Sequence, residues 1–223
     1  MTSYGGQLYA LVAKDMRLEL RTRESFTSVL VYALLVLVIF NFALDLRPEI
    51  IDAVGPGVLW VAVVFTGPVA LARTFSEERD RGTLEMLLAA PVERSALFVS
   101  KLAGSIFVMA AAQIVLVPAF IALFNVRLDP LVLLPALLLG DIGLATVGTI
   151  FSAIAAHTRA REILLPVLVF PIIVPLVIAV VQATGLALGN GLAQDHPWVG
   201  LLVAFDAVYL AIGTVVFEYV LEE

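Results

Sequence analysis

The sequence of 223 residues contains no cysteine and little charge, since only 14% of its residues are Asp, Glu, Lys or Arg. The lack of cysteine excludes disulfides, a thiol nucleophile and any metal site built on thiolates. Soluble domains carry about 25% charged residues, so this chain has too few to coat a surface exposed to water. The composition therefore excludes a water-soluble enzyme, a disordered chain and a nucleic-acid-binding protein.

The sequence also lacks the short motifs that mark common catalytic sites. It has no Gly-x-x-x-x-Gly-Lys-Ser/Thr phosphate loop, no His-Glu-x-x-His and no Gly-x-Ser-x-Gly. We therefore predict no P-loop ATP site, no metal site and no serine nucleophile elbow. The chain is not expected to be an enzyme in its own right.

Hydrophobic residues, by contrast, make up 61% of the chain. A bilayer span needs about 20 mainly apolar residues, which predicts an all-α membrane protein with six transmembrane helices in a single domain, 1–223. The first apolar run is too long for the core of a signal peptide, so we expect it to stay as an anchor. The six predicted spans are about Phe26–Leu44, Ile51–Ala72, Leu102–Phe124, Leu131–Ala155, Ile163–Thr184 and Trp198–Val220.

Basic residues lie mostly on one side of the predicted spans. Of the 13 Lys and Arg, four precede the first span, five lie between the second and third, and two lie between the fourth and fifth. Only Arg47 and Arg127 fall on the other side. Because cytoplasmic connections are enriched in Lys and Arg, both termini are predicted to be cytoplasmic.

The connection between the second and third spans is the longest polar stretch. Ser76 can cap a helix whose first turn is acidic, which suits the positive end of the helix dipole. Gly82 interrupts that turn, and a second short helix, about Thr83–Ala90, ends before Pro91. Two interpretations stay open: a charged loop anchored at the lipid headgroups, or a docking helix bound by a cytoplasmic partner.

The same connection carries a resemblance to a known family. The order Phe75-Ser-Glu-Glu-Arg-Asp-Arg-Gly-Thr-Leu-Glu85, then Leu87-Leu-Ala-Ala-Pro91 and Lys101-Leu, resembles the CcmB family of haem exporters, the ABC-transporter permeases of the cytochrome c maturation system. The proline-rich stretch Leu165–Pro175, the small-residue-rich fourth span and the overall length agree with it.

The resemblance implies an ABC-2-type exporter permease in the bacterial inner membrane, with a cytoplasmic elbow helix (5–24) and a cytoplasmic coupling segment (73–95). Its partners would be a cytoplasmic ABC ATPase that holds the ATP, other cytochrome c maturation subunits and the bilayer, with a homodimer left open and no nucleic acid. Haem would be transported or handled. The alternatives are a permease for another hydrophobic substrate and a proton-coupled carrier. The residues carried over for ATPase coupling are Phe75, Glu77, Glu78, Arg79, Gly82, Thr83 and Glu85.

The N-terminal residues 5–24 can form an amphipathic helix along the cytoplasmic surface. Its apolar side holds Leu and Val residues, and its other side holds Lys14, Arg17 and Arg21. Asp15 and Glu19 fall inside the apolar sector, and Arg23 stands where it could pair with Glu19. Either this face rests on lipid, or it meets another protein.

Polar residues inside the predicted spans are candidates for function, because a charge in the bilayer is costly. Asp141 falls near the midplane of the fourth span, on a face of small residues that should pack on another helix. Counted along the spans, Asp206 falls nearer the outer side, and Gln113 and Gln182 fall at other depths. The plainer interpretation is that these residues join helices or stay protonated.

The fifth span carries Pro166, Pro171 and Pro175, each of which removes a backbone donor, so we expect this helix to be kinked. A bent helix beside a lateral opening is the functional interpretation, and simple packing is the other.

Histidine is scarce, with two in the chain. Haem iron takes axial histidine ligands, so His196, next to Trp198 on the outer side, is a candidate haem contact, although an ordinary loop role competes. His157 lies in a cytoplasmic turn and is expected to be a surface residue. We expect no firm haem binding by this chain alone.

Overall fold

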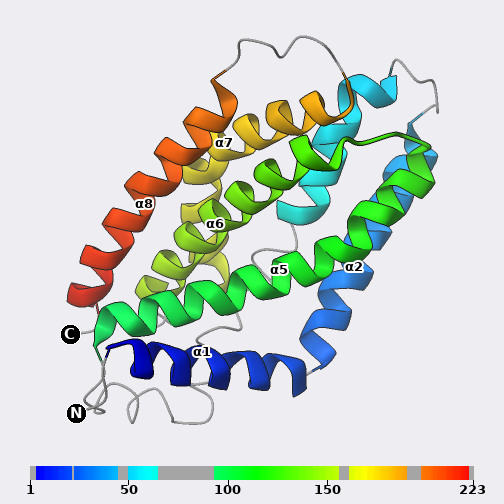
Figure 1. The fold of residues 1–223 in the computed structure, drawn as a ribbon. Helices are drawn as coiled ribbons and strands as arrows, with labels where there is room; N and C mark the ends of the chain where they lie inside the picture. Colours follow the sequence, from blue (N-terminus) through cyan, green and yellow to red (C-terminus); the bar gives the residue numbers. More distant parts are fainter. Residues whose placement is uncertain are drawn as a thin grey trace.

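The computed structural model describes residues 4–21, 23–44, 50–64, 93–155, 161–189 and 197–220. Within these ranges every regular element is an α-helix and no strand occurs, which confirms the predicted all-α class (Figure 1). The helices are α1 (Tyr4–Arg21), α2 (Arg23–Ala43), a helix over Ile50–Val64, α5 (Arg94–Phe124), α6 (Pro130–Ala155), α7 (Arg161–Ala187) and α8 (Trp198–Val220).

Within the described ranges, four helices are long and apolar enough to cross a membrane: α5, α6, α7 and α8. They coincide with the third to sixth predicted spans. The first predicted span falls on α2, which is apolar over the described stretch Leu30–Ala43, and the second begins as the helix Ile50–Val64. The rest of the second span, 65–72, lies outside the described residues. The chain is a multi-pass membrane protein.

The helix α5 begins eight residues before Leu102, where the third span is predicted to start, because its first residue is Arg94. The charged residue Lys101 therefore lies inside the helix. Lysine is a good helix former, so α5 continues through this position. The Lys101 ammonium group is buried against an acidic side chain of α1, which lets this charge lie among apolar residues.

The helix α6 is central in the bundle, because it contacts α5, α7 and α8 (Figure 1). The helix α5 contacts α6 and α8, and also α1 and α2. Side chains of α5 accordingly contribute to two apolar clusters, one shared with α6, α7 and α8 and one shared with α2 and Ile50–Val64. The bundle also exposes many large apolar side chains, as a helix bundle surrounded by lipid must.

Short hydrogen bonds fix the ends of these helices. Asn125 closes α5 in the left-handed conformation, with φ 52°. The Asp129 carboxylate accepts the N–H of Leu131 at 2.9 Å and so caps α6, and its own N–H donates to the carbonyl of Ala187 at 2.8 Å. The connection between α5 and α6 is thereby joined to the end of α7.

The start of α1, the start of α5 and the end of α8 lie at the same end of the bundle (Figure 1). The rings of Phe98 on α5 and Phe217 on α8 are 5.3 Å apart, which brings the last two of these ends together. On the predicted orientation this end would be cytoplasmic.

Candidate functional site

The coupling segment, residues 73–95, is described only at its last three residues. The residues predicted to engage an ATPase therefore lie outside the described ranges, and their roles stay predictions: Phe75, Glu77, Glu78, Arg79, Gly82, Thr83 and Glu85. What the structure does show is the element on which this segment ends, namely the first turns of α5 with α1 packed beside them.

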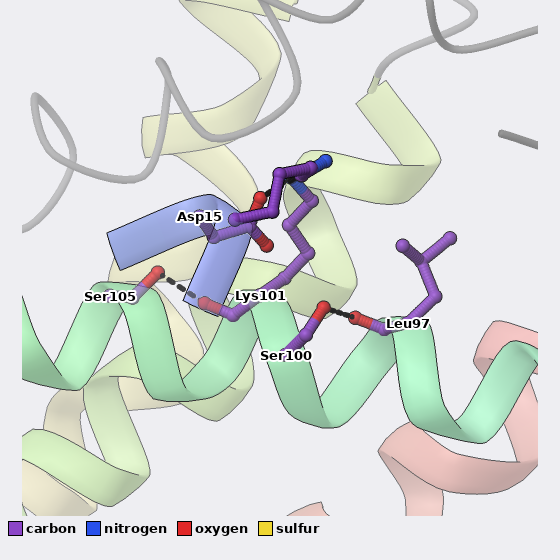
Figure 2. A network of polar contacts seen from close by, with 6 residues as sticks. Asp15, Leu97, Ser100, Lys101 and Ser105 are labelled. Atoms are coloured by element: carbon purple, nitrogen blue, oxygen red, sulfur yellow. Dashed lines mark hydrogen bonds and ion pairs between the residues drawn. The ribbon is translucent and has the colours of Figure 1, made fainter. Parts of the chain in front are cut away.

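An ion pair joins these two helices (Figure 2). Lys101 Nζ donates to Asp15 Oδ1 at 3.4 Å, and Lys14 Nζ lies 3.2 Å from the same oxygen. The side chains of Lys101 and Asp15 are only 4% and 10% exposed, whereas that of Lys14 is 37% exposed. The pair that bridges the helices is thus the buried one.

Two serines of α5 near this pair direct their hydroxyl groups to their own helix. Ser100 Oγ donates to the carbonyl of Leu97 at 2.9 Å, and Ser105 Oγ donates to the carbonyl of Lys101 at 3.0 Å (Figure 2). These bonds engage both hydroxyl groups within α5, so the compensation of the Asp15 charge comes from the lysines.

A second contact lies eight residues earlier along both segments, where the N–H of Glu93, the residue before α5, donates to Gln7 Oε1 at 3.3 Å. We call Gln7, Asp15, Glu93 and Lys101 the α1–α5 joint. The predicted N-terminal helix, 5–24, is present as α1 (Tyr4–Arg21), and the acidic residue in its apolar sector is explained, because that face meets α5 of the same chain. Its place along the cytoplasmic surface stays a prediction. The predicted pair between Glu19 and Arg23 involves side chains outside the described part.

At the middle of the bundle, three polar side chains reach one level of α6 from different sides, because residues two apart on a helix point in nearly opposite directions. We call them the central polar cluster: Gln113 of α5, Asp141 of α6 and Asp206 of α8. Gln113 Nε2 donates to Asp141 Oδ1 at 2.7 Å. Asp206 Oδ1 lies 2.8 Å from the point where a Cβ on Gly143 would stand, two residues from Asp141. Asp141 is 1% exposed and Asp206 is 4% exposed.

The expectation that these residues lie at different depths was therefore wrong. Gln113 and Asp206 both reach the same short stretch of α6, because the helices are staggered along one another and position counted from a predicted span end does not measure depth. Gln182, also considered from the sequence, is exposed on α7 and takes no part in the central polar cluster.

The cluster carries acidic groups without a basic neighbour on their own helices. Neither α6 nor α8 contains Lys or Arg. Among the described residues, Asp141 Oδ2 and both carboxyl oxygens of Asp206 have no hydrogen-bond partner. Such a site can accept hydrogen bonds from an amide, a water molecule or a ligand, or can hold a proton, at a depth where charge is costly.

Glycines of α6 let the neighbouring helices approach this site. A Cβ on Gly140 would overlap the indole ring of Trp60, and one on Gly143 would stand 2.7 Å from Leu176 Cδ1. Trp60 Nε1 also donates to Thr184 Oγ1 at 2.8 Å and so joins Ile50–Val64 to α7. The predicted packing of the small-residue face is confirmed, since Ala145, Gly148 and Ser152 are buried.

Sequence reasoning did not identify Gly140, Gly143, Trp60 or Thr184. The available signal was the Gly-x-x-Gly spacing around Asp141, because small residues in a span mark close helix contacts. A tryptophan in the middle of an apolar span was a second signal, because its N–H needs a hydrogen-bond partner when it is buried.

The remaining candidates lie elsewhere. The helix α7 is continuous from Arg161 to Ala187, so its prolines do not end it, and the side chains of Pro171 and Pro175 are exposed. The predicted kink, for which Pro166 was also considered, stays a prediction. Trp198 begins α8 and packs against the main apolar cluster, whereas His196 and His157 lie outside the described residues.

Comparison with known proteins agrees with the resemblance noted in the sequence. The family model described as CcmB protein matches residues 6–222. Heme exporter protein B of Paracoccus denitrificans is 28% identical over 211 residues, covering 91% of each chain. The protein of the same name from Rhodobacter capsulatus is 27% identical over 170 residues, covering 76% of this chain and 78% of that one. The protein from Haemophilus influenzae is 28% identical over 189 residues, covering 81% of this chain and 84% of that one. The chain therefore belongs to the CcmB family.

Proposed function

We propose that this chain is the membrane permease subunit of an ABC transporter that exports or handles haem during the biogenesis of c-type cytochromes. The observation that carries the proposal is the match to relatives named heme exporter protein B over most of both chains. Haem is then cargo, and ATP is hydrolysed by a separate cytoplasmic subunit. Other cytochrome c maturation subunits would complete the complex, and the chain could form a dimer within it.

The topology proposed for this role has six spans with both termini in the cytoplasm of a bacterial cell. One line of support is that eleven of the 13 Lys and Arg fall on one side of six predicted spans. The other is that the start of α1, the start of α5 and the end of α8 lie at the same end of the bundle (Figure 1). The inner membrane is the site where both ATP and haem of the cytoplasm are available.

Because the chain has no cysteine, introduced cysteines test this topology directly. Arg17→Cys on the exposed side of α1 and Arg127→Cys on the connection after α5 each supply a single thiol. In intact cells a membrane-impermeant maleimide should label Arg127→Cys and should leave Arg17→Cys unlabelled until the membrane is permeabilised. Labelling of both from outside would contradict the topology.

The coupling segment would form the contact with the ATPase. Its acidic first turn suits the dipole of a short helix and a basic or polar groove on the partner. Closure of two ATPase copies on ATP would then move this segment, and the movement would change access to the haem-handling site. His196 and Trp198 are the proposed haem contacts on the outer side.

Co-purification tests the contact. A tagged ATPase subunit from the same operon should retain the wild-type chain in mild detergent and lose a Glu77→Lys/Glu78→Lys/Glu85→Lys variant, whose charge is reversed at the proposed groove. A matched triple change to lysine on the outer connections controls for added positive charge. Full retention of the first variant would contradict the docking role of these glutamates.

The central polar cluster favours a second candidate, a proton-coupled carrier that uses Asp141 and Asp206. The observation in its favour is that both carboxyl groups reach the same level of α6. This candidate expects transport that continues after ATP depletion and stops in an Asp141→Asn variant. The ABC permease expects the reverse dependence on ATP.

A further inference from the structure

The α1–α5 joint holds two helices in one register. The two contact points, Gln7 with Glu93 and Asp15 with Lys101, are eight residues apart on each helix. Equal spacing in the same direction means that α1 and the first turns of α5 run parallel, matched over about 12 Å at 1.5 Å per residue. Gly104 adds a close approach, because a Cβ there would stand 3.9 Å from Cβ of Asp15.

An ion pair between oppositely charged side chains, Asp15 and Lys101, holds the joint together. Lys101 is almost completely buried, and its ammonium group pairs there with the Asp15 carboxylate (Figure 2). Asp15, in contrast, also has Lys14 at 3.2 Å on its own helix. Sliding α1 along α5 by even one turn would separate Lys101 from Asp15 and break this buried ion pair, so the pair favours this one register.

The joint lies between the coupling segment and two of the predicted spans. Glu93 is the last residue before α5 and belongs to the end of the coupling segment. On the other side, α1 ends at Arg21 and α2 begins at Arg23, two positions later. The joint therefore links the end of the coupling segment to the first predicted span as well as to the third.

We propose that Asp15 and Lys101 are positioning residues that make α1 and the first turns of α5 one mechanical unit. A displacement of the coupling segment then moves α1, and through it α2, together with α5. This inference rests on the proposed ATPase-coupled function, and it adds which residues transmit the movement and that α1 and α5 stay together throughout the cycle.

A redox-controlled cross-link tests the inference. In the variant Asp15→Cys/Gly104→Cys the Cβ separation of 3.9 Å suits a disulfide, which needs about 3.5–4.5 Å, and the chain has no other thiol. The whole complex, purified with its ATPase subunit in lipid nanodiscs, is oxidised, and ATP hydrolysis is measured. A matched control is Arg17→Cys/Gly104→Cys, in which residue 17 is exposed and no cross-link is expected.

If α1 and the first turns of α5 move as one unit, oxidation does not slow this variant: the cross-linked complex hydrolyses ATP at least as fast as the same complex kept reduced. A fall of about fivefold or more, reversed by a reductant, would show that the two helices must separate and would overturn the inference. Loss of the ATPase from the wild-type complex would instead overturn the proposed function, so the two failures are distinguishable.

Charge exchange supplies the second readout. In cells that depend on this chain for c-type cytochromes, Asp15→Asn should lower the amount of haem-stained cytochrome about fivefold or more, while the ATPase still co-purifies. The exchange Asp15→Lys/Lys101→Asp restores an opposite-charge pair and should recover most of the signal. If Asp15→Asn matches the wild type, the pair has no positioning role; if neither variant yields folded chain, the cross-link result decides.

Discussion

At the α1–α5 joint a buried acidic side chain faces a basic one, whereas in the central polar cluster the acidic side chains face an amide and a glycine backbone. Asp15 meets Lys101 at 3.4 Å, while Asp141 meets Gln113 at 2.7 Å. The joint lies at the start of α5, whereas Asp141 of the cluster lies near the middle of α6. The difference teaches that opposite charges fix helix register at the edge, while neutral hydrogen bonds and small residues bring helices together at the centre, where charge costs most.

The largest expected effect comes from filling the glycine contacts at the centre. Gly143→Leu would force a side chain into Leu176 and Asp206, and Gly140→Leu into Trp60, so we expect about 3 kcal/mol or more of lost stability. The measurement is thermal unfolding and size-exclusion behaviour in detergent. Gly200→Leu is the matched control, because nothing lies within 4 Å of a Cβ at that exposed position of α8. Equal stability of the Gly143→Leu and Gly200→Leu proteins would contradict close packing at the centre.

The next effect tests the asymmetry of the joint. Asp15→Asn removes the carboxylate that pairs with the buried Lys101, which we expect to cost about 3 kcal/mol, as for other buried pairs that lose one member. Lys101→Met should cost only about 1 kcal/mol, because Asp15 keeps its exposed neighbour Lys14 and a half-buried pair is worth that much at most. Unfolding temperatures of the two variants, compared in the same detergent, give the order. The reverse order would mean that Lys14 does not compensate Asp15.

A smaller effect is expected at the hydrogen bond of the central polar cluster. A double-mutant cycle with Gln113→Leu and Asp141→Leu should give a coupling energy of about 1 kcal/mol, as other hydrogen bonds between membrane helices do. Asp141→Asn keeps an oxygen that can accept from Gln113 and should be close to the wild type. A coupling energy of zero would show that the two side chains do not interact.

The smallest effect on stability is expected for Asp206→Asn. The change is isosteric, and no hydrogen bond to a described residue is lost, so we expect less than about 0.5 kcal/mol. The amount of haem-stained c-type cytochrome in cells that carry Asp206→Asn is then compared with the amount in cells that carry Asp141→Asn. A stable protein without that signal would assign Asp206 a functional role, whereas a large loss of stability would refute the expectation of no partner.

Much of the architecture was predictable because it depends on local features. Long apolar runs placed α5, α6, α7 and α8, and the small-residue face of α6 indicated its burial. The start of α5 was not predictable, because Lys101 marks the end of a span unless its partner on α1 is known.

A single sequence could also not predict that the three residues of the central polar cluster lie at the same height along α6. It depends on how α5 and α8 are staggered against α6, and the stagger is set by tertiary contacts such as that of Gly143 with Leu176 and Asp206. The family resemblance came from the coupling segment, whose motif is readable without any structure, and the match over residues 6–222 then showed the family.

The most direct test of the central claim is the amount of covalently bound haem in c-type cytochromes, measured by haem staining of membrane proteins from the native host. We predict that deletion of this chain removes the signal and that the wild-type chain restores it, whereas the variant Glu77→Lys/Glu78→Lys/Glu85→Lys does not. An undiminished signal in the deletion strain would contradict a role in haem export for c-type cytochromes.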